Sequence, residues 1–402
     1  MASGATIDHI IAVTILLTAM LLTMMTFNGL FAQALEYDTN RQIANKAVDV
    51  MNSICLSPGS PVDWGETDDD VLGFGLQDPD ASGYTLSPYS VMRLQTHEND
   101  LIEYPKGPGA YYNNLTAGFG SGVYTSVGEC LTHEEVSDFL GLTGEYDFSI
   151  DITPTLNVNI EKLSESYVSL KVNVTGLSLP LSGATLKYYI FHIAGDGEII
   201  PPPDLGVVQT NPYGEAILDF TSILSDDAFS FVVYAELGGV TGVGYYAQDA
   251  LVGNLPFVVP LIEDYETGEV IIAHAWDIFK DDSITDIVHC DASFFVLTSD
   301  FHFQEVEVVC PTGPLNYGES QPYFTLDIPE DEVGILVISY VKDTNKVGSV
   351  IVPWGVGTVG VPAMFKSEFG SKDYNFVATE IRQVTIDDIS YQVKVSVWKL
   401  GN

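Results

Sequence analysis

The sequence predicts an α+β fold, in which a long N-terminal α-helix is followed by a mainly β head of two tandem sandwiches. Three observations support this prediction. An apolar run lies near the N-terminus, β-branched and aromatic segments follow from Asp147, and a turn-and-hairpin pattern recurs after about 105 residues. The predicted divisions are a helix over 1–56, a loop-rich head segment over 57–146, a first sandwich over 147–250, and a second sandwich with C-terminal strands over 251–402.

The N-terminal segment is apolar and almost uncharged. Residues 1–35 contain no Lys or Arg, and Asp8 is their single carboxylate. The apolar run over 10–31 is longer than the ~20 residues that a membrane-spanning helix needs. Helix-like spacing of apolar residues then continues as far as Ile54, and the SPGSP stretch at 57–61 ends it. A helix from Thr6 to Leu56 would be ~75 Å long at about 1.5 Å per residue.

Two interpretations of this helix remain open. It is either a plain membrane anchor with a stalk, or a helix that leaves the membrane and packs against copies of itself. Four threonines and Asn28 within the run can bond between helices or back to their own backbone, so they do not distinguish the two. In the second interpretation, the candidate polymerisation residues are Asp8, Ile10, Ile11, Val13, Ile15, Leu16, Leu17, Leu21, Leu22, Phe27, Leu30 and Phe31.

Two stretches of the chain carry a resemblance to a known family. Residues 4–13, GATIDHIIAV, run without basic flanks into a half-polar helix, and residues 57–65, SPGSPVDWG, follow that helix directly. Both resemble type IV pilins and pilin-like proteins, most closely those of archaea. The resemblance covers residues 1–65 and implies a protein that is inserted in the membrane, clipped by a prepilin peptidase and polymerised by a pilus assembly machinery. The bundled N-terminal helices would form the filament core.

The resemblance also implies a role for Asp8. Many pilins carry a glutamate near the mature start that neutralises the N-terminal amine of a neighbouring subunit. Asp8 is the single candidate for that role here, although its position departs from the family pattern. The alternative is that Asp8 lies at the positive end of its own helix dipole.

The predicted head begins with loops and continues with strands. Thr132 and Glu135 form a capping-box pattern before a short helix over 132–140. The spacing of the later strand-like segments is typical of an immunoglobulin-like sandwich of about 100 residues. These segments are 147–160, 167–174, 184–193, 216–220 and 229–237.

A second sandwich is predicted because a sequence pattern of the first is repeated. The turn NPYGE at 211–215 and the hairpin after it recur as NYGE at 316–319 with a second hairpin. The alternative is chance similarity between two hairpins. The sequence ends in two further predicted strands around Asp387 and Asp388, whose packing partners cannot be identified from the sequence.

Four cysteines occur, and none lies in a CxxC pattern. An even number outside the membrane indicates disulfides, and by domain we favour Cys55–Cys130 and Cys290–Cys310 over the other two pairings. The alternative is four buried free thiols in a reducing compartment.

Composition excludes some classes of function. The formal net charge is −40, from 15 basic and 55 acidic residues, so nucleic acid is not an expected partner. No hydrolase, zinc-protease, P-loop or dinucleotide-binding motif occurs, and we predict no enzyme activity, no cofactor and no metal site. Calcium binding at acidic loops such as 68–70 is the alternative to solvated acidic turns.

The sequence therefore predicts a structural subunit of an extracellular type IV pilus-like filament at the cell surface, adhesive through its head. Sequons at Asn114 and Asn173 predict N-glycosylation and favour the same location. The expected partners are the chain itself, the membrane before assembly and surface glycans. A membrane-anchored monomeric surface or pseudopilin-like protein is the alternative, and a membrane-tethered hydrolase is a third class without a visible catalytic set.

Overall fold

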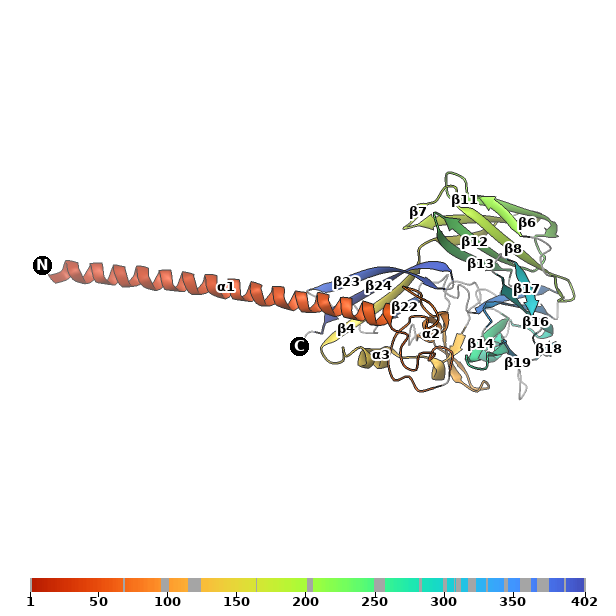
Figure 1. Ribbon diagram of the computed structural model, residues 1–402, viewed down its shortest axis with the longest axis horizontal. Helices are drawn as coiled ribbons and strands as arrows, with labels where there is room; N and C mark the ends of the chain where they lie inside the picture. The colour runs from red at the N-terminus through yellow and green to blue at the C-terminus, as the bar shows by residue number, and fades with distance from the viewer. Residues whose placement is uncertain are drawn as a thin grey trace.

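The computed structural model shows one long helix, α1 (Ala2–Leu56), that projects from a mainly β head (Figure 1). The α+β class predicted from the sequence is confirmed at this level. The structure describes the chain except for residues 1, 68, 95–100, 115–123, 164, 201–204, 249–256, 282–283, 299–301, 307, 309–311, 317–322, 330–331, 343–345, 355–362, 367–375, 387 and 401–402.

The C-terminal third of α1 is docked on the head. Apolar residues that recur every three or four positions form one stripe on the helix, and the stripe is buried against the head. Its members are 0–2% exposed: Ile43, Ala47, Val50, Met51 and Ile54. The Arg382 guanidinium adds a polar tie by donating from Nη1 to Asn52 Oδ1 at 3.0 Å.

The helix docks on an antiparallel sheet that joins distant parts of the chain, and we call it the docking sheet. Its order is β22-β4-β24-β23, and Figure 1 shows these strands beside the end of α1. Alternate residues of β4 and β24, such as Phe148, Ile150 and Val395, belong to the same buried cluster as the helix stripe. The strands are β4 (Tyr146–Pro154), β22 (Ala363–Lys366), β23 (Val377–Ile386) and β24 (Ile389–Lys399).

This sheet corrects two predicted divisions. The segment at the start of 147–250 was assigned to the first sandwich, and the C-terminal strands to the second. Instead β4 pairs with β24 along its whole length, from Tyr146 opposite Lys399 to Pro154 opposite Tyr391. The alternating pattern of β4 shows that one face of the strand is buried, but it does not show against which element. In the structure that face covers the apolar stripe of α1.

The first β unit spans 157–247 and consists of two sheets that enclose one core. Val168 and Leu170 of β6 share that core with Phe229 and Phe231 of β12. The sheet orders are β11-β6-β5, with β7 beside β6, and β10-β8-β12-β13, with β9 beside β8. The bounds are β5 (Asn157–Lys162), β6 (Tyr167–Gly176), β7 (Leu179–Pro180), β8 (Thr185–Ile193), β9 (Ile199–Ile200), β10 (Gly206–Gln209), β11 (Glu215–Leu224), β12 (Phe229–Leu237) and β13 (Val240–Ala247).

The second β unit also has two sheets around one core, which includes Ile272 of β15 and Ile338 of β20. The orders are β1-β2-β3-β14-β15-β19 and β17-β16-β20-β21, with β18 beside β16. The bounds are β1 (Ile102–Tyr104), β2 (Ala110–Asn114), β3 (Tyr124–Ser126), β14 (Val258–Asp264), β15 (Glu269–His274), β16 (Ile287–Leu297), β17 (Phe303–Val306), β18 (Gly313–Leu315), β19 (Tyr323–Asp327), β20 (Gly334–Lys342) and β21 (Val347–Trp354).

The segment 57–146 is therefore more than the loop-rich region that the sequence predicted. Its strands β1–β3 extend a sheet of the second unit through a parallel pairing of β3 with β14. It also contains α2 (Pro88–Met92), the 3₁₀ turn η2 (Val127–Glu129) and α3 (His133–Phe139). The capping box of Thr132 and Glu135 at the start of α3 is confirmed.

Strand order repeats between the two units. The arrangement β11-β6-β5 recurs as β19-β15-β14, and β8-β12-β13 recurs as β16-β20-β21. The central strand begins at Phe229 in the first unit and at Gly334 in the second, a displacement of 105 residues. A shared order of six strands exceeds the chance similarity of two hairpins.

The two units pack against each other through the sheets β10-β8-β12-β13 and β17-β16-β20-β21. Phe191 and Phe295 lie 4.7 Å apart between ring centroids, and the buried Ser230 hydroxyl donates to the Ser349 hydroxyl at 3.1 Å. Aromatic contacts and buried hydrogen bonds of this kind fix the relative orientation of the units.

The docking contact generates a stability prediction. Ile54→Ala removes a fully buried side chain from the contact between α1 and the docking sheet, so we expect it to lower the free energy of unfolding of the head by about 2–5 kcal/mol. Ile15→Ala is the matched control, because Ile15 is 64% exposed and touches no part of the head core. Urea unfolding of the detergent-solubilised protein, followed by near-ultraviolet circular dichroism, measures both. An equal loss for the two variants would contradict the docking contact.

Candidate functional site

The first candidate site is the exposed part of α1, which we call the apolar shaft and define as residues 9–38. Every residue of this segment is exposed. The candidate polymerisation residues from Ile10 to Phe31 are between 51% and 70% exposed, so the chain's own head covers none of them. Five further large apolar side chains of the shaft were not among the predicted candidates: Met20, Met24, Met25, Leu35 and Tyr37.

The hydroxyls of the shaft are bonded within the helix. Thr14, Thr18, Thr23 and Thr26 each donate to the carbonyl four residues earlier at 2.8 Å. Of the two roles that the sequence left open for these threonines, the described structure contains the bond to their own backbone. The shaft consequently presents methyl groups and hydrocarbon outward at these positions.

Most of the shaft carries no charged side chain. Between Asp8 and Glu36 the sequence contains no Asp, Glu, Lys or Arg. By length and composition α1 is sufficient to cross a membrane. The side chain of Asp8 lies outside the described residues, so both roles considered for it stay predictions.

The segment that follows α1 includes the SPGSPVDWG stretch and is held by buried contacts of Trp64 and Arg93. We call these two residues and their contacts the Trp64–Arg93 clamp. Trp64 is fully buried and donates from Nε1 to the carbonyls of Pro58 at 2.9 Å and Gly75 at 3.0 Å. Arg93 lies over the Trp64 ring, at 5.7 Å from Cζ to the centroid, and donates from Nε to the Glu129 carbonyl at 2.6 Å. The clamp fixes the direction in which the head leaves the helix.

Two predicted disulfide cysteines are separate thiols, so the predicted Cys55–Cys130 disulfide is wrong. Cys55 Sγ faces Met51 Sδ at 3.5 Å within α1, while Cys130 Sγ lies 4.0 Å from Asn113 Nδ2. The two thiols are buried in different surroundings, which sequence distance and domain assignment did not reveal. Burial raises the pKa of Cys130 to about 12, against the opposing effect of Arg93.

The described residues do not decide the second predicted disulfide, Cys290–Cys310. Cys290 is buried in β16, and Cys310 lies outside the described residues. The Cys290–Cys310 disulfide therefore stays a prediction.

The two sequon asparagines lie on strands. Asn173 is half-buried in β6, opposite Asn159 and Glu215 on the neighbouring strands. Asn114 is half-buried at the end of β2, and Thr116 of its sequon lies outside the described residues. Glycosylation of either position stays a prediction.

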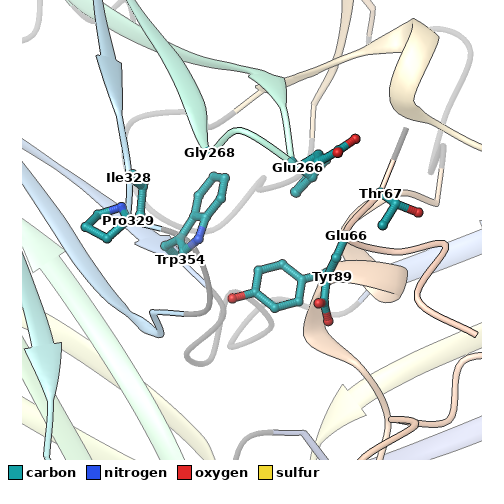
Figure 2. A pocket seen from close by; sticks show the side chains of 9 residues that line it. Glu66, Thr67, Tyr89, Glu266, Gly268, Ile328, Pro329 and Trp354 are labelled. Carbon is teal, nitrogen blue, oxygen red and sulfur yellow. The ribbon is translucent and has the colours of Figure 1, made fainter. Parts of the chain in front are cut away.

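The second candidate site is a pocket of about 230 Å³ in the head (Figure 2). It lies where the segment after α1 meets the second β unit. The Tyr265 ring stacks on Trp354 with centroids 5.7 Å apart, and the Tyr89 ring of α2 meets Trp354 edge-on at 6.3 Å. Glu66 and Glu266 place two carboxylates in the same lining.

The described residues contain no group of three or more His, Cys, Asp or Glu side chains that could hold a metal ion. The short helix α4 (Ala275–Phe279) contains the buried Asp277, and Lys106 approaches its Oδ1 at 2.7 Å. This ion pair joins the turn after β1 to α4. At the start of α4, burial lowers the pKa of His274, whose ring caps the helix by accepting from the Trp276 backbone N–H.

Comparisons with known proteins identify no family. No protein-family model and no curated protein matches the chain. Among solved structures, trypsin-activated alpha-2-macroglobulin from Escherichia coli is 13% identical over 58% of this chain and 18% of its own, with a TM-score of 0.21. A chimeric titin Z1Z2–Z1Z2 tandem is 14% identical over 49% of this chain and 97% of its own, with a TM-score of 0.13. The chain thus spans about a fifth of the macroglobulin. Scores this low carry no argument about function.

Thiol reactivity tests the cysteine environments. At pH 8 a thiol with a pKa of about 12 is ionised to about one part in ten thousand, so Cys130 should resist iodoacetamide in the folded protein. After denaturation without reductant, both Cys55 and Cys130 should be alkylated, and prior reductant should not change the yield at either residue. Peptide mapping by mass spectrometry measures the labelling. A Cys55–Cys130 cross-linked peptide in the non-reduced digest would contradict the structure.

Proposed function

We propose that the chain is the structural subunit of an extracellular type IV pilus-like filament, in which the apolar shafts of many copies bundle into the core. The observation that carries the proposal is an uncovered helical shaft, with no charged side chain between Asp8 and Glu36, on an acidic head that covers only the C-terminal end of the same helix. The resemblance of residues 4–13 and 57–65 to archaeal pilins supports the same assignment.

The energetics favour burial of the shaft by other molecules. Sixteen large apolar side chains between Ile10 and Tyr37 are more than half exposed. At about 1.5–3 kcal/mol for each full burial, covering them would contribute tens of kcal/mol gross per subunit. Neighbouring shafts can supply this cover in the filament, and lipid can supply it before assembly.

The bonded threonine hydroxyls suit close packing between shafts. Because each hydroxyl already donates to its own backbone, a neighbouring helix meets no buried donor that lacks an acceptor. The shaft can therefore enter a helix bundle without a specific hydrogen-bonding partner at these positions.

In this filament the head would form the outer sheath. Its tandem units are proposed to be immunoglobulin-like sandwiches, because each places one three-strand arrangement against a second that contains a central hairpin. Display of the units at the cell surface would allow adhesion to surface glycans, and the sequons at Asn114 and Asn173 would carry glycans of the filament itself. A prepilin peptidase and an assembly machinery would be the partners before polymerisation.

A second candidate function is a membrane-anchored monomeric surface or pseudopilin-like protein. The observation that favours it is the length and apolarity of α1, which suffice for a membrane span without any polymer. The two functions share the fold and differ in what surrounds the shaft.

A charge placed in the shaft tests the filament. We expect Leu21→Lys to abolish filaments, because an unpaired cation in a bundle of apolar helices cannot be hydrated. Electron microscopy of material sheared from cells that produce the variant measures this. Leu177→Lys is the matched control, because Leu177 lies in the head and is 86% exposed, so filaments should persist.

Two outcomes would contradict the filament. The first is that the unmodified chain is recovered only as a monomer in detergent extracts of membranes, which would favour the anchored protein. The second is that the Leu21→Lys variant assembles in normal amounts while it remains correctly inserted in the membrane.

A further inference from the structure

Two exposed turns at one end of the first β unit form an apolar surface, which we call the tip. The tip consists of residues 177–180, which include β7, and residues 211–213, which lie before β11. Every residue of both turns is exposed. Leu177 is 86% exposed, Leu179 66% and Tyr213 76%. Figure 1 shows β7 on the side of the first unit away from β16, β17 and β18 of the second unit.

Hydrogen bonds hold the two turns of the tip together. The Val174 N–H, at the end of β6, donates to the Gly214 carbonyl at 2.8 Å. A Cβ at Gly214 would lie 3.1 Å from the Cβ of Pro180, so the two turns are in close contact. The Asn211 side chain closes the second turn by accepting from the Tyr213 N–H at 2.8 Å. The fold therefore presents the tip as one preformed surface.

The backbone at the tip is unfavourable for a leucine. Leu177 has a φ of +49° and Ser178 a φ of +66°, in the left-handed region that favours glycine. A two-residue hairpin turn with two positive φ angles is usually formed by sequences such as Asn-Gly or Gly-Gly. Here a large apolar side chain occupies the first position and remains in contact with water. Neither the conformation of the turn nor the core of the unit accounts for Leu177.

The segments that form this end of the unit carry no charge. Residues 172–186 and 205–214 contain no Asp, Glu, Lys or Arg, although the chain has 55 acidic and 15 basic residues. Lys171, just before the first segment, lies 2.9 Å from Glu161 and 4.0 Å from Glu215, just after the second segment. The tip is therefore an uncharged apolar area on an acidic head, and the charges at its border are paired.

Size and chemistry favour a lipid surface over a protein partner for the tip. A stable protein interface takes about 20–30 residues from each side, whereas the tip has four residues in one turn and three in the other. Insertion into a bilayer needs only projecting apolar side chains and no charge to desolvate. A tyrosine beside the leucines suits the headgroup level, where Tyr and Trp are enriched.

We propose that the tip inserts into an uncharged phospholipid bilayer, with Leu177 and Leu179 in the hydrocarbon and Tyr213 among the headgroups. Figure 1 shows β7 near the C-terminal end of α1 and far from residues 10–31. The tip would therefore meet a bilayer other than one that holds the shaft. The tip is separate from the apolar shaft, so its binding to lipid does not rest on the proposed filament.

The test keeps the shaft occupied, because α1 is apolar enough to insert into added lipid by itself. The full-length protein is held through its shaft in phosphatidylcholine nanodiscs, and phosphatidylcholine vesicles are added. Flotation in a density gradient measures the binding of nanodiscs to vesicles. We expect the double variant Leu177→Asp, Leu179→Asp to weaken this binding about tenfold or more, because carboxylates are costly in hydrocarbon.

A matched control and a change of salt separate insertion from other causes of binding. Ile217→Asp should bind as the unmodified protein does, because Ile217 is 60% exposed on β11 of the same unit but lies outside the tip. Binding by inserted side chains should persist when the salt concentration is raised from about 0.1 to about 0.5 M, since screening weakens only electrostatic attraction. Thermal unfolding checks that each variant is folded.

Four outcomes would overturn lipid insertion by the tip. The first is that nanodiscs with the unmodified protein do not float with the vesicles. The second is that the folded double variant binds as the unmodified protein does. The third is that Ile217→Asp loses as much binding as the double variant. The fourth is that binding disappears at the higher salt concentration.

Discussion

The architecture depends on one constraint: the chain contains more apolar helix surface than its own head can cover. The stripe from Ile43 to Ile54 is buried by the docking sheet, whereas the apolar shaft receives no cover from the head. Because both parts belong to one uninterrupted helix, α1, the covered end holds the uncovered end at a fixed angle to the head. The free energy of burying the shaft is thereby coupled to the placement of the head.

The docking sheet explains how a head of two β units can be joined rigidly to a helix. Strand β4 directly precedes the first β unit in the chain, whereas β23 and β24 follow the second unit, so strands distant in sequence meet on α1. The segment after α1 reinforces the joint, because the Leu86 N–H donates to the Thr385 carbonyl at 2.9 Å beside the edge of β23. Together with the contacts of Trp64 and Arg93, these interactions hold α1 to the head through elements that are distant in sequence.

Local patterns in the sequence predicted the elements well and their partners poorly. Helical spacing predicted α1 to within a few residues, because amphipathic periodicity states directly which face is buried. The alternation in β4 is equally clear, but it does not reveal that Phe148 faces a helix rather than a second sheet. The three-residue strands β1 and β3 were missed among Gly- and Pro-rich turns. The pocket could not be predicted, because Glu66, Tyr89 and Trp354 come from segments that only the tertiary fold brings together.

The distribution of charge completes the division between shaft and head. Helix α1 carries four carboxylates and two basic side chains, a net charge of −2, so the remaining chain carries −38 of the total −40. In the proposed filament, bundling of nearly neutral shafts would bring strongly acidic heads side by side, and their repulsion would oppose assembly. That repulsion is screened beyond about 10 Å at an ionic strength near 0.1 M, whereas burial of hydrocarbon acts at contact and is not weakened by salt in this way. Attraction and repulsion therefore act on different parts of the molecule. Close contact between shafts is favoured, while the heads remain hydrated and apart.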